Sequence, residues 1–171
     1  MRIATVMSDE RGRTDLILAE VAVALMAKGL QVAGVVQTNF DRPGRSHCDM
    51  DIWVLPDGPE IRINQQLGEG AHGCRLDAGA LETAVAQVEA RFSEDVDILI
   101  LNKFGKQEAE GRGFRALIAE ALARGIPVLT GVNRLNAAAF DQFAEGMAEP
   151  LAAEAAQILS WCHARLPRVP A

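Results

Sequence analysis

The sequence has few aromatic residues and no long apolar segment. Tyrosine is absent, and aromatic residues make up 5% of the 171 positions. The two tryptophans, Trp53 and Trp161, lie in no basic or aromatic run, so they are expected to pack rather than to stack on bases. No apolar run approaches the length of a membrane span, and the first residues lead straight into a strand pattern. Neither a membrane anchor nor a signal peptide is therefore expected.

Positive charge and cysteine are also scarce. The net charge of −6 argues against a general surface for nucleic acids or anionic membranes. Three cysteines, an odd number at spacings that suit no disulfide framework, indicate reduced thiols and a cytoplasmic setting. The length and the 49% hydrophobic content predict one globular domain over residues 1–166, with residues 167–171 as a tail. Nothing in the sequence sets the oligomeric state.

Short apolar runs alternate with segments of helical periodicity. This pattern is typical of a three-layer α/β fold with a mostly parallel sheet and helices on both faces. Asp77 suits the N-cap of one helix, and Asp51 is expected opposite Asn64 in a hairpin. Strands are predicted over residues 2–6, 32–37, 97–101 and 127–132, the hairpin over 51–64, and helices over 15–28, 77–92, 114–124, 135–143 and 154–166.

Residues 7–14 read MSDERGRT between the first strand and the first helix. A phosphate-binding loop reads GxxxxGK[ST] in the same setting, where backbone N–H groups cradle phosphates, the lysine reaches them and the hydroxyl holds Mg²⁺. Here Gly12 and Thr14 fit that pattern, while Met7 replaces the first glycine and Arg13 replaces the lysine. The segment resembles a phosphate-binding loop whose chemistry has changed.

A plainer interpretation of the same segment is a helix start capped by Thr14 or Asp15. A helix N-terminus beside Arg11 and Arg13 is nevertheless well suited to an anion, because its N–H groups and its dipole both favour negative charge.

Residues 102–114 follow the most hydrophobic predicted strand and are polar, rich in glycine and basic in their first half. They are interpreted as a ligand-facing loop, with a solvated surface loop as the alternative. Lys103 and Lys106 would join Arg11 and Arg13 to place up to four cations around one point in an acidic protein. That concentration favours a phosphate-like or oxyanion ligand.

Two histidines and two cysteines form a second candidate site. If the hairpin pairs as expected, it would bring His47 and Cys48 toward His72 and Cys74. Such a set suits Zn²⁺ or another soft metal. The spacing is not that of a zinc finger, so ordinary packing and loop polarity remain the alternative.

In the order of these motifs, from about residue 1 to 132, the chain resembles the small P-loop nucleoside-triphosphatases, called cancer-related in animals. It is more specifically similar to a bacterial family of unknown function grouped with P-loop proteins. Members of that family lie near molybdenum-uptake genes, so the resemblance implies a possible accessory role in molybdenum or other metal metabolism. The segments that carry the closer similarity are VVQTN at 35–39, HCD at 47–49, GCRLD at 73–77 and NKFGKQE at 102–108.

The resemblance implies binding of an ATP- or GTP-type nucleotide with Mg²⁺. The implied phosphate contacts are Arg11, Gly12, Arg13, Thr14, Asn102, Lys103 and Lys106. The triphosphatases carry acidic residues at the positions of Asn102 and Lys103, and these support the metal and activate water. An amide and an ammonium cannot do so, which leaves Glu108 as the one acidic residue of the motif able to act as a base.

We therefore expect weak or absent triphosphatase activity. The alternative function is a non-enzymatic binding module, for a small oxyanion such as phosphate or molybdate, or for a metal ion through the His and Cys residues.

Overall fold

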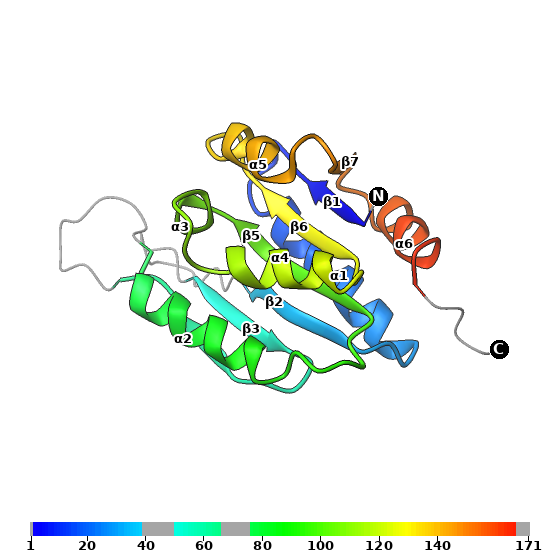
Figure 1. Ribbon diagram of the computed structural model, residues 1–171, viewed down its shortest axis with the longest axis horizontal. Helices are drawn as coiled ribbons and strands as arrows, with labels where there is room; N and C mark the ends of the chain where they lie inside the picture. Colours follow the sequence, from blue (N-terminus) through cyan, green and yellow to red (C-terminus); the bar gives the residue numbers. More distant parts are fainter. Residues whose placement is uncertain (1, 39–49, 66–75, 167–171) are drawn as a thin grey trace.

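The computed structural model describes residues 2–38, 50–65 and 76–166. One seven-stranded sheet runs through it in the order β4-β3-β2-β5-β6-β1-β7 (Figure 1). The strands are β1 (Ile3–Val6), β2 (Val32–Thr38), β3 (Asp51–Leu55), β4 (Glu60–Arg62), β5 (Ile98–Phe104), β6 (Val128–Val132) and β7 (Glu149–Leu151). The helices are α1 (Arg13–Ala27), α2 (Ala78–Glu89), α3 (Lys106–Ala109), α4 (Arg115–Ala123), α5 (Ala137–Ala144) and α6 (Ala155–His163).

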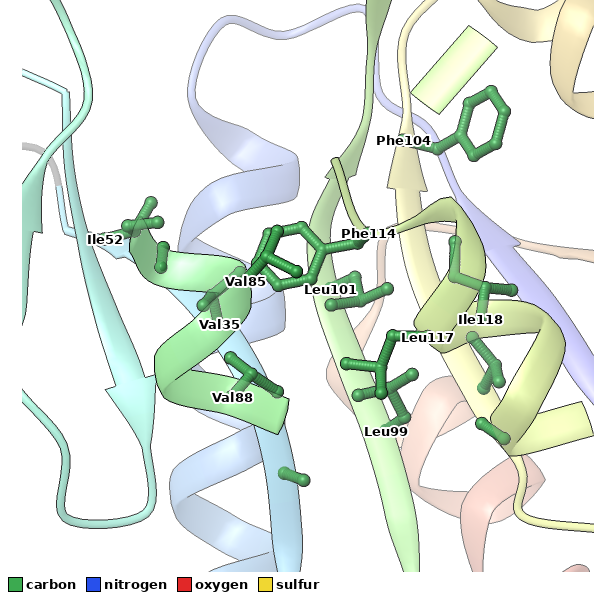
Figure 2. Packing of buried hydrophobic residues seen from close by; sticks show 14 of the residues in the cluster. Val35, Ile52, Val85, Val88, Leu99, Leu101, Phe104, Phe114, Leu117 and Ile118 are labelled. Carbon is green, nitrogen blue, oxygen red and sulfur yellow. The ribbon is translucent and has the colours of Figure 1, made fainter. Parts of the chain in front are cut away.

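The sheet separates two hydrophobic cores, which makes the fold three-layered. Successive residues of β5 point to opposite faces, so Leu99 and Leu101 enter the core under α2 and α4 while Ile98 and Ile100 enter the core under α1 and α6. Figure 2 shows Val85 and Val88 of α2 and Leu117 and Ile118 of α4 directed at the first face. The expected fold class, with helices on both faces, is confirmed.

Most of the sheet is parallel. β1 pairs in parallel with β6 and β7, β6 with β5, and β5 with β2, while β3 and β4 add an antiparallel hairpin. The carboxyl ends of β1, β2, β5 and β6 therefore lie at one edge, where ligands bind in such sheets. None of the helices described is long and apolar enough to cross a membrane.

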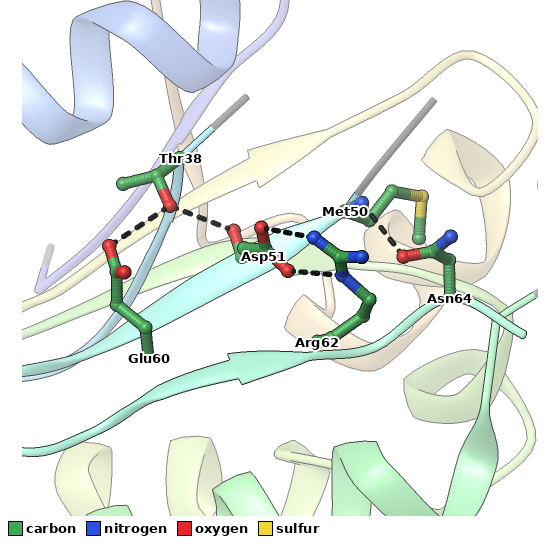
Figure 3. A network of polar contacts seen from close by, with 6 residues as sticks. All are labelled: Thr38, Met50, Asp51, Glu60, Arg62 and Asn64. Atoms are coloured by element: carbon green, nitrogen blue, oxygen red, sulfur yellow. Dashed lines mark hydrogen bonds and ion pairs between the residues drawn. The ribbon is translucent and has the colours of Figure 1, made fainter. Parts of the chain in front are cut away.

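The hairpin forms as expected, but its predicted register is wrong. Asp51 pairs with Arg62 rather than with Asn64. The Arg62 guanidinium donates to both oxygens of the Asp51 carboxylate, at 2.8 and 3.1 Å, and Asn64 instead accepts the backbone N–H of Met50 (Figure 3). The tight turn causes the shift, because the N–H of Gly58 donates to the carbonyl of Val54 and closes the hairpin earlier than the sequence pattern implied.

Two further elements differ from the prediction. β5 continues to Phe104, beyond the expected end at residue 101, so Asn102 and Lys103 belong to a strand and not to a loop. β7 was not predicted because three residues with Pro150 in the middle carry almost no strand signal; a proline is tolerated at this place because β7 is an edge strand.

β2 and β5 approach each other closely at Gly34. This residue pairs with Ile100 and has φ 120°, and a Cβ added to it would lie 1.8 Å from the carbonyl oxygen of Ile100. Only glycine fits at this position.

Candidate functional site

The end of β5 carries an irregularity that redirects two side chains. Leu101 pairs with Thr130 of β6 and Phe104 pairs with Val132, so three steps along β5 match two along β6. This extra residue is a β-bulge, a feature that re-aims side chains and is common beside functional sites. Phe104 still enters the core, where its ring meets that of Phe140 edge to face at 5.1 Å and fixes the strand end.

At this irregularity the adjacent Asn102 and Lys103 both reach the first turn of α1. The amide Nδ2 of Asn102 donates to Oδ1 of Asp15 at 2.8 Å, and the Nζ of Lys103 lies 3.6 Å from the same oxygen. Asn102 is 4% exposed and Asp15 7%. The side-chain oxygen Oδ1 of Asn102 is buried and accepts no hydrogen bond from the residues described. A buried acceptor of this kind is rare and points to a missing partner.

Gly131 of β6 leaves the space in which this contact forms. β6 lies between β1, which leads into α1, and β5, so the side chains from the two sides must meet over it. A Cβ at Gly131 would lie 2.9 Å from Cγ2 of Thr14 and 3.4 Å from Cβ of Lys103. The absence of a side chain there lets Thr14 and Lys103 pack over the strand.

The turn before α1 is closed by its own hydrogen bonds. The N–H of Ser8 donates to Oγ1 of Thr14 at 3.2 Å, and the N–H of Arg13 donates to the carbonyl of Glu10 at 3.2 Å. Helix α1 follows Gly12, which has φ 75° and no capping side chain. The expected cap by Thr14 or Asp15 is therefore wrong: α1 begins at Arg13, and both side chains serve other contacts.

The predicted cations have separate partners. Lys103 lies at α1, but Lys106 lies 3.7 Å from Glu110 on the next turn of its own segment. Arg13 extends toward the carbonyl of Ala153, at 3.5 Å, and Arg11 is exposed. Of the four expected cations, Lys103 is thus the one built into the contact with Asp15, and phosphate contacts from all four stay predictions.

Glu108 is buried, although it comes from a polar segment. Its side chain is 2% exposed, and its two carboxylate oxygens accept the backbone N–H groups of Gly105 and Phe114 at 2.9 and 3.0 Å. A Cβ at Gly113 would lie 2.1 Å from Oε1 of Glu108, so the chain wraps tightly around the carboxylate. Residues 105–114 are therefore an organised turn with the short helix α3, and not the open loop expected from their composition.

Burial raises the pKa of Glu108 above its ordinary value, with a smaller contribution from the nearby Glu82 carboxylate. The hydrogen bonds from Phe114 and Gly105 act in the opposite direction, because they favour the ionised form. Through these hydrogen bonds the Glu108 carboxylate holds the turn over residues 105–114 together. Its role as a catalytic base stays a prediction.

The four residues of the candidate zinc site, His47, Cys48, His72 and Cys74, lie outside the described residues. Within residues 2–38, 50–65 and 76–166, no three His, Cys, Asp or Glu side chains are grouped as metal ligands. The remaining cysteine, Cys162, is buried in the core beneath α1 and α6, and burial raises the pKa of its thiol to about 12.

Asp15 and Gly131 belong to the site but were not identified as such from the sequence. Asp15 was considered only as a helix cap, and Gly131 had no distinguishing signal within an apolar strand. The spacing of Leu101 and Phe104 was a usable signal for the irregular end of β5. Two apolar residues three positions apart lie on the same face of a sheet only when a bulge separates them.

Comparison with known proteins places these observations in context. A family described as "Protein of unknown function (DUF2478)" matches residues 3–161. The molybdenum import ATP-binding protein ModC 2 of Bradyrhizobium diazoefficiens is 38% identical over 160 residues, which is 94% of this chain but 18% of that protein. The chain thus spans less than a fifth of the length of this relative.

The solution structure of a human cancer-related nucleoside triphosphatase has a similar fold. The TM-score is 0.64 at 15% sequence identity, and the match covers 89% of this chain and 88% of the human one. At that identity the likeness establishes the fold. The predicted resemblance to P-loop triphosphatases is confirmed at this level.

Proposed function

The chain belongs to the DUF2478 family of proteins of unknown function, and on that premise we propose that it binds the phosphate groups of an ATP- or GTP-type nucleotide with little or no hydrolysis. The observation that carries the proposal is the meeting of α1 with Asn102 and Lys103 at the carboxyl edge of the sheet. The N-terminus of this 15-residue helix favours an anion through its dipole and N–H groups. The name of the ModC 2 relative, which includes ATP binding, supports the same ligand class.

A second candidate is a non-enzymatic module for a tetrahedral oxyanion such as molybdate or phosphate. The observation that favours it is the name of the ModC 2 relative, which assigns that protein to molybdenum import. Under either candidate the protein serves as an accessory factor, and the same helix N-terminus would hold the anion.

Mg²⁺ is the metal implied by the resemblance, and the side chains at α1 do not suit it as a resident ion. Mg²⁺ prefers carboxylate and other oxygen ligands in an octahedral shell. The Asp15 carboxylate already faces the Lys103 ammonium and the Asn102 amide. A divalent ion beside Asp15 would therefore lie next to a fixed positive charge, which repels it.

The ligand class is tested by thermal denaturation with ATP, GTP, phosphate and molybdate, each with and without Mg²⁺. A ligand that binds the native state raises the melting temperature by mass action. A rise with ATP or GTP supports the nucleotide, and a rise with molybdate or phosphate alone supports the oxyanion module. If none of the four raises the melting temperature, both candidates fail.

Replacing Arg13 by alanine is expected to weaken binding of the stabilising ligand about tenfold, the scale of one lost charge-assisted contact. Calorimetry on the folded variant measures this. Arg91→Ala is the matched control, because Arg91 contacts Asp57 in the hairpin turn, beyond the opposite edge of the sheet. If Arg13→Ala binds as tightly as the wild type, Arg13 does not contact the ligand.

Turnover of ATP and GTP by the wild-type protein is expected to be slow or absent, because the positions that would hold metal and water carry an amide and an ammonium. From the sequence, the double variant Asn102→Asp with Lys103→Glu is expected to raise any basal release of phosphate if the rest of the loop is competent. In the structure it sets two further carboxylates beside Asp15, so the gain should appear only with Mg²⁺ present to neutralise them. Hydrolysis by the wild type at a typical rate, about 1 per second or more, would show that Glu108 or another group positions the water.

A further inference from the structure

The ammonium of Lys103 lies beside the first turn of α1, at the carboxyl edge of the sheet. Its Nζ is 3.6 Å from Oδ1 of Asp15, and Asn102 donates to that same oxygen from the adjacent position. The Lys103 side chain is 35% exposed and the Asp15 side chain 10% exposed. The lysine can therefore be reached from solvent at the edge of the sheet, while the carboxylate that it contacts is buried.

A carboxylate in the first turn of α1 has a cost for anion binding. Asp15 would repel a phosphate held at the same helix end, and a buried carboxylate also needs a compensating charge. Lys103 neutralises Asp15, so the positive end of the α1 dipole remains available to a ligand.

The unpartnered side-chain oxygen Oδ1 of Asn102 belongs to the same cluster. It is buried and accepts no hydrogen bond within the described part of the chain. An ammonium has three N–H donors. One of them faces Asp15, and the partly exposed side chain leaves others for an oxygen of a phosphate group.

We infer that this site binds its phosphate or oxyanion ligand as the metal-free anion, with Lys103 as a built-in cation in place of a divalent ion. The inference rests on the proposed function and specifies the form of the ligand. Gly131 leaves room for this arrangement, since a Cβ there would crowd Thr14 and Leu18, at 2.9 and 3.2 Å, and would touch Lys103 at 3.4 Å.

The first test is calorimetric titration of the wild-type protein with ATP, inorganic phosphate and molybdate, in EDTA and again in excess Mg²⁺. We expect at least one probe to bind in EDTA, and Mg²⁺ to tighten its binding by less than about threefold. Binding that needs Mg²⁺, or is tightened beyond that factor, overturns the inference but leaves the proposed function intact. If no probe binds in either condition, the proposed function fails and this inference fails with it. The ATP arm distinguishes a nucleotide from the two free oxyanions.

The second test uses Lys103→Ala on the same probe. In EDTA we expect the affinity to fall by about tenfold or more, because Asp15 then loses the positive charge of Lys103 and repels the anion more strongly. Mg²⁺ should restore part of that loss by neutralising Asp15. Unchanged affinity in EDTA overturns the role of Lys103.

Two further variants separate charge from folding. Lys28→Ala is the matched control, since Lys28 lies at the far end of α1, where its Nζ is 3.0 Å from the His163 ring; its affinity should equal that of the wild type. The double variant Lys103→Ala with Asp15→Asn removes both charges and should bind more tightly in EDTA than Lys103→Ala alone. If the double variant binds no more tightly than Lys103→Ala, Lys103 does not act by neutralising Asp15.

Discussion

Replacing Gly34 by alanine is expected to abolish stable folding. The added Cβ would lie 1.8 Å from the carbonyl oxygen of Ile100 and 2.8 Å from its carbonyl carbon, both backbone atoms of the neighbouring strand. Because β2 and β5 pair at this point in the middle of the sheet, neither strand can move away without breaking the pairing. We expect a loss of more than about 4 kcal/mol in the free energy of unfolding, comparable to the whole stability of many domains.

Gly29→Ala is the matched control for this change. Gly29 also has a positive φ, 80°, but no atom lies within 4 Å of an added Cβ. The left-handed backbone alone should cost about 1–2 kcal/mol. Urea denaturation of both variants measures the difference. Equal losses would mean that backbone conformation, and not the clash with Ile100, is what requires glycine at position 34.

The second large effect is expected at Glu108. Glu108→Ala removes the acceptor of two backbone N–H groups, those of Gly105 and Phe114, and leaves a gap at the centre of the turn. Buried donors without a partner are costly, so we expect a loss of about 3 kcal/mol in the free energy of unfolding. Glu110→Gln, two residues along on an exposed position, should change stability little. A loss of activity from Glu108→Ala with no loss of stability would instead favour a catalytic role.

The raised pKa of Glu108 also predicts a pH dependence. Its ordinary value is 4.5, and burial makes the folded protein hold the proton to higher pH than the unfolded chain does. The stability linked to this proton is present below about pH 4.5 and is lost as the pH rises through the folded pKa. Glu108→Gln cannot ionise and should lack this component. The stability of the wild type minus that of Glu108→Gln should therefore fall as the pH is raised, and a difference that is constant from pH 4 to 8 would contradict the shift.

The order of elements could be read from the sequence because it depends on local periodicity. Alternating buried strands and amphipathic helices leave few arrangements other than a layered parallel sheet. The Asp77 cap was also predictable, because the side chain acts within its own turn: it accepts the N–H of Ala80 at 3.0 Å.

The details of the site depend on contacts between distant segments, and the local pattern does not contain them. β5 seemed to end at Leu101 because Asn102 and Lys103 are polar, whereas pairing of Phe104 with Val132 extends it. The burial of Glu108 was hidden by its polar neighbours, since the donors that satisfy it are backbone groups of Gly105 and Phe114. The residue types in this segment do not predict such a contact.

The central position of β5 determines where a bound ligand will be detectable. β5 lies between β2 and β6, and its residues from Ile98 to Leu101 are at most 1% exposed. Amides of such a strand exchange with deuterium only when the whole sheet opens, whether or not the site is filled. The turn over residues 8–12 makes few hydrogen bonds to other segments, so its amides should exchange through local opening. Occupancy of the site should thus slow deuterium uptake in this turn while uptake from Ile98 to Leu101 barely changes.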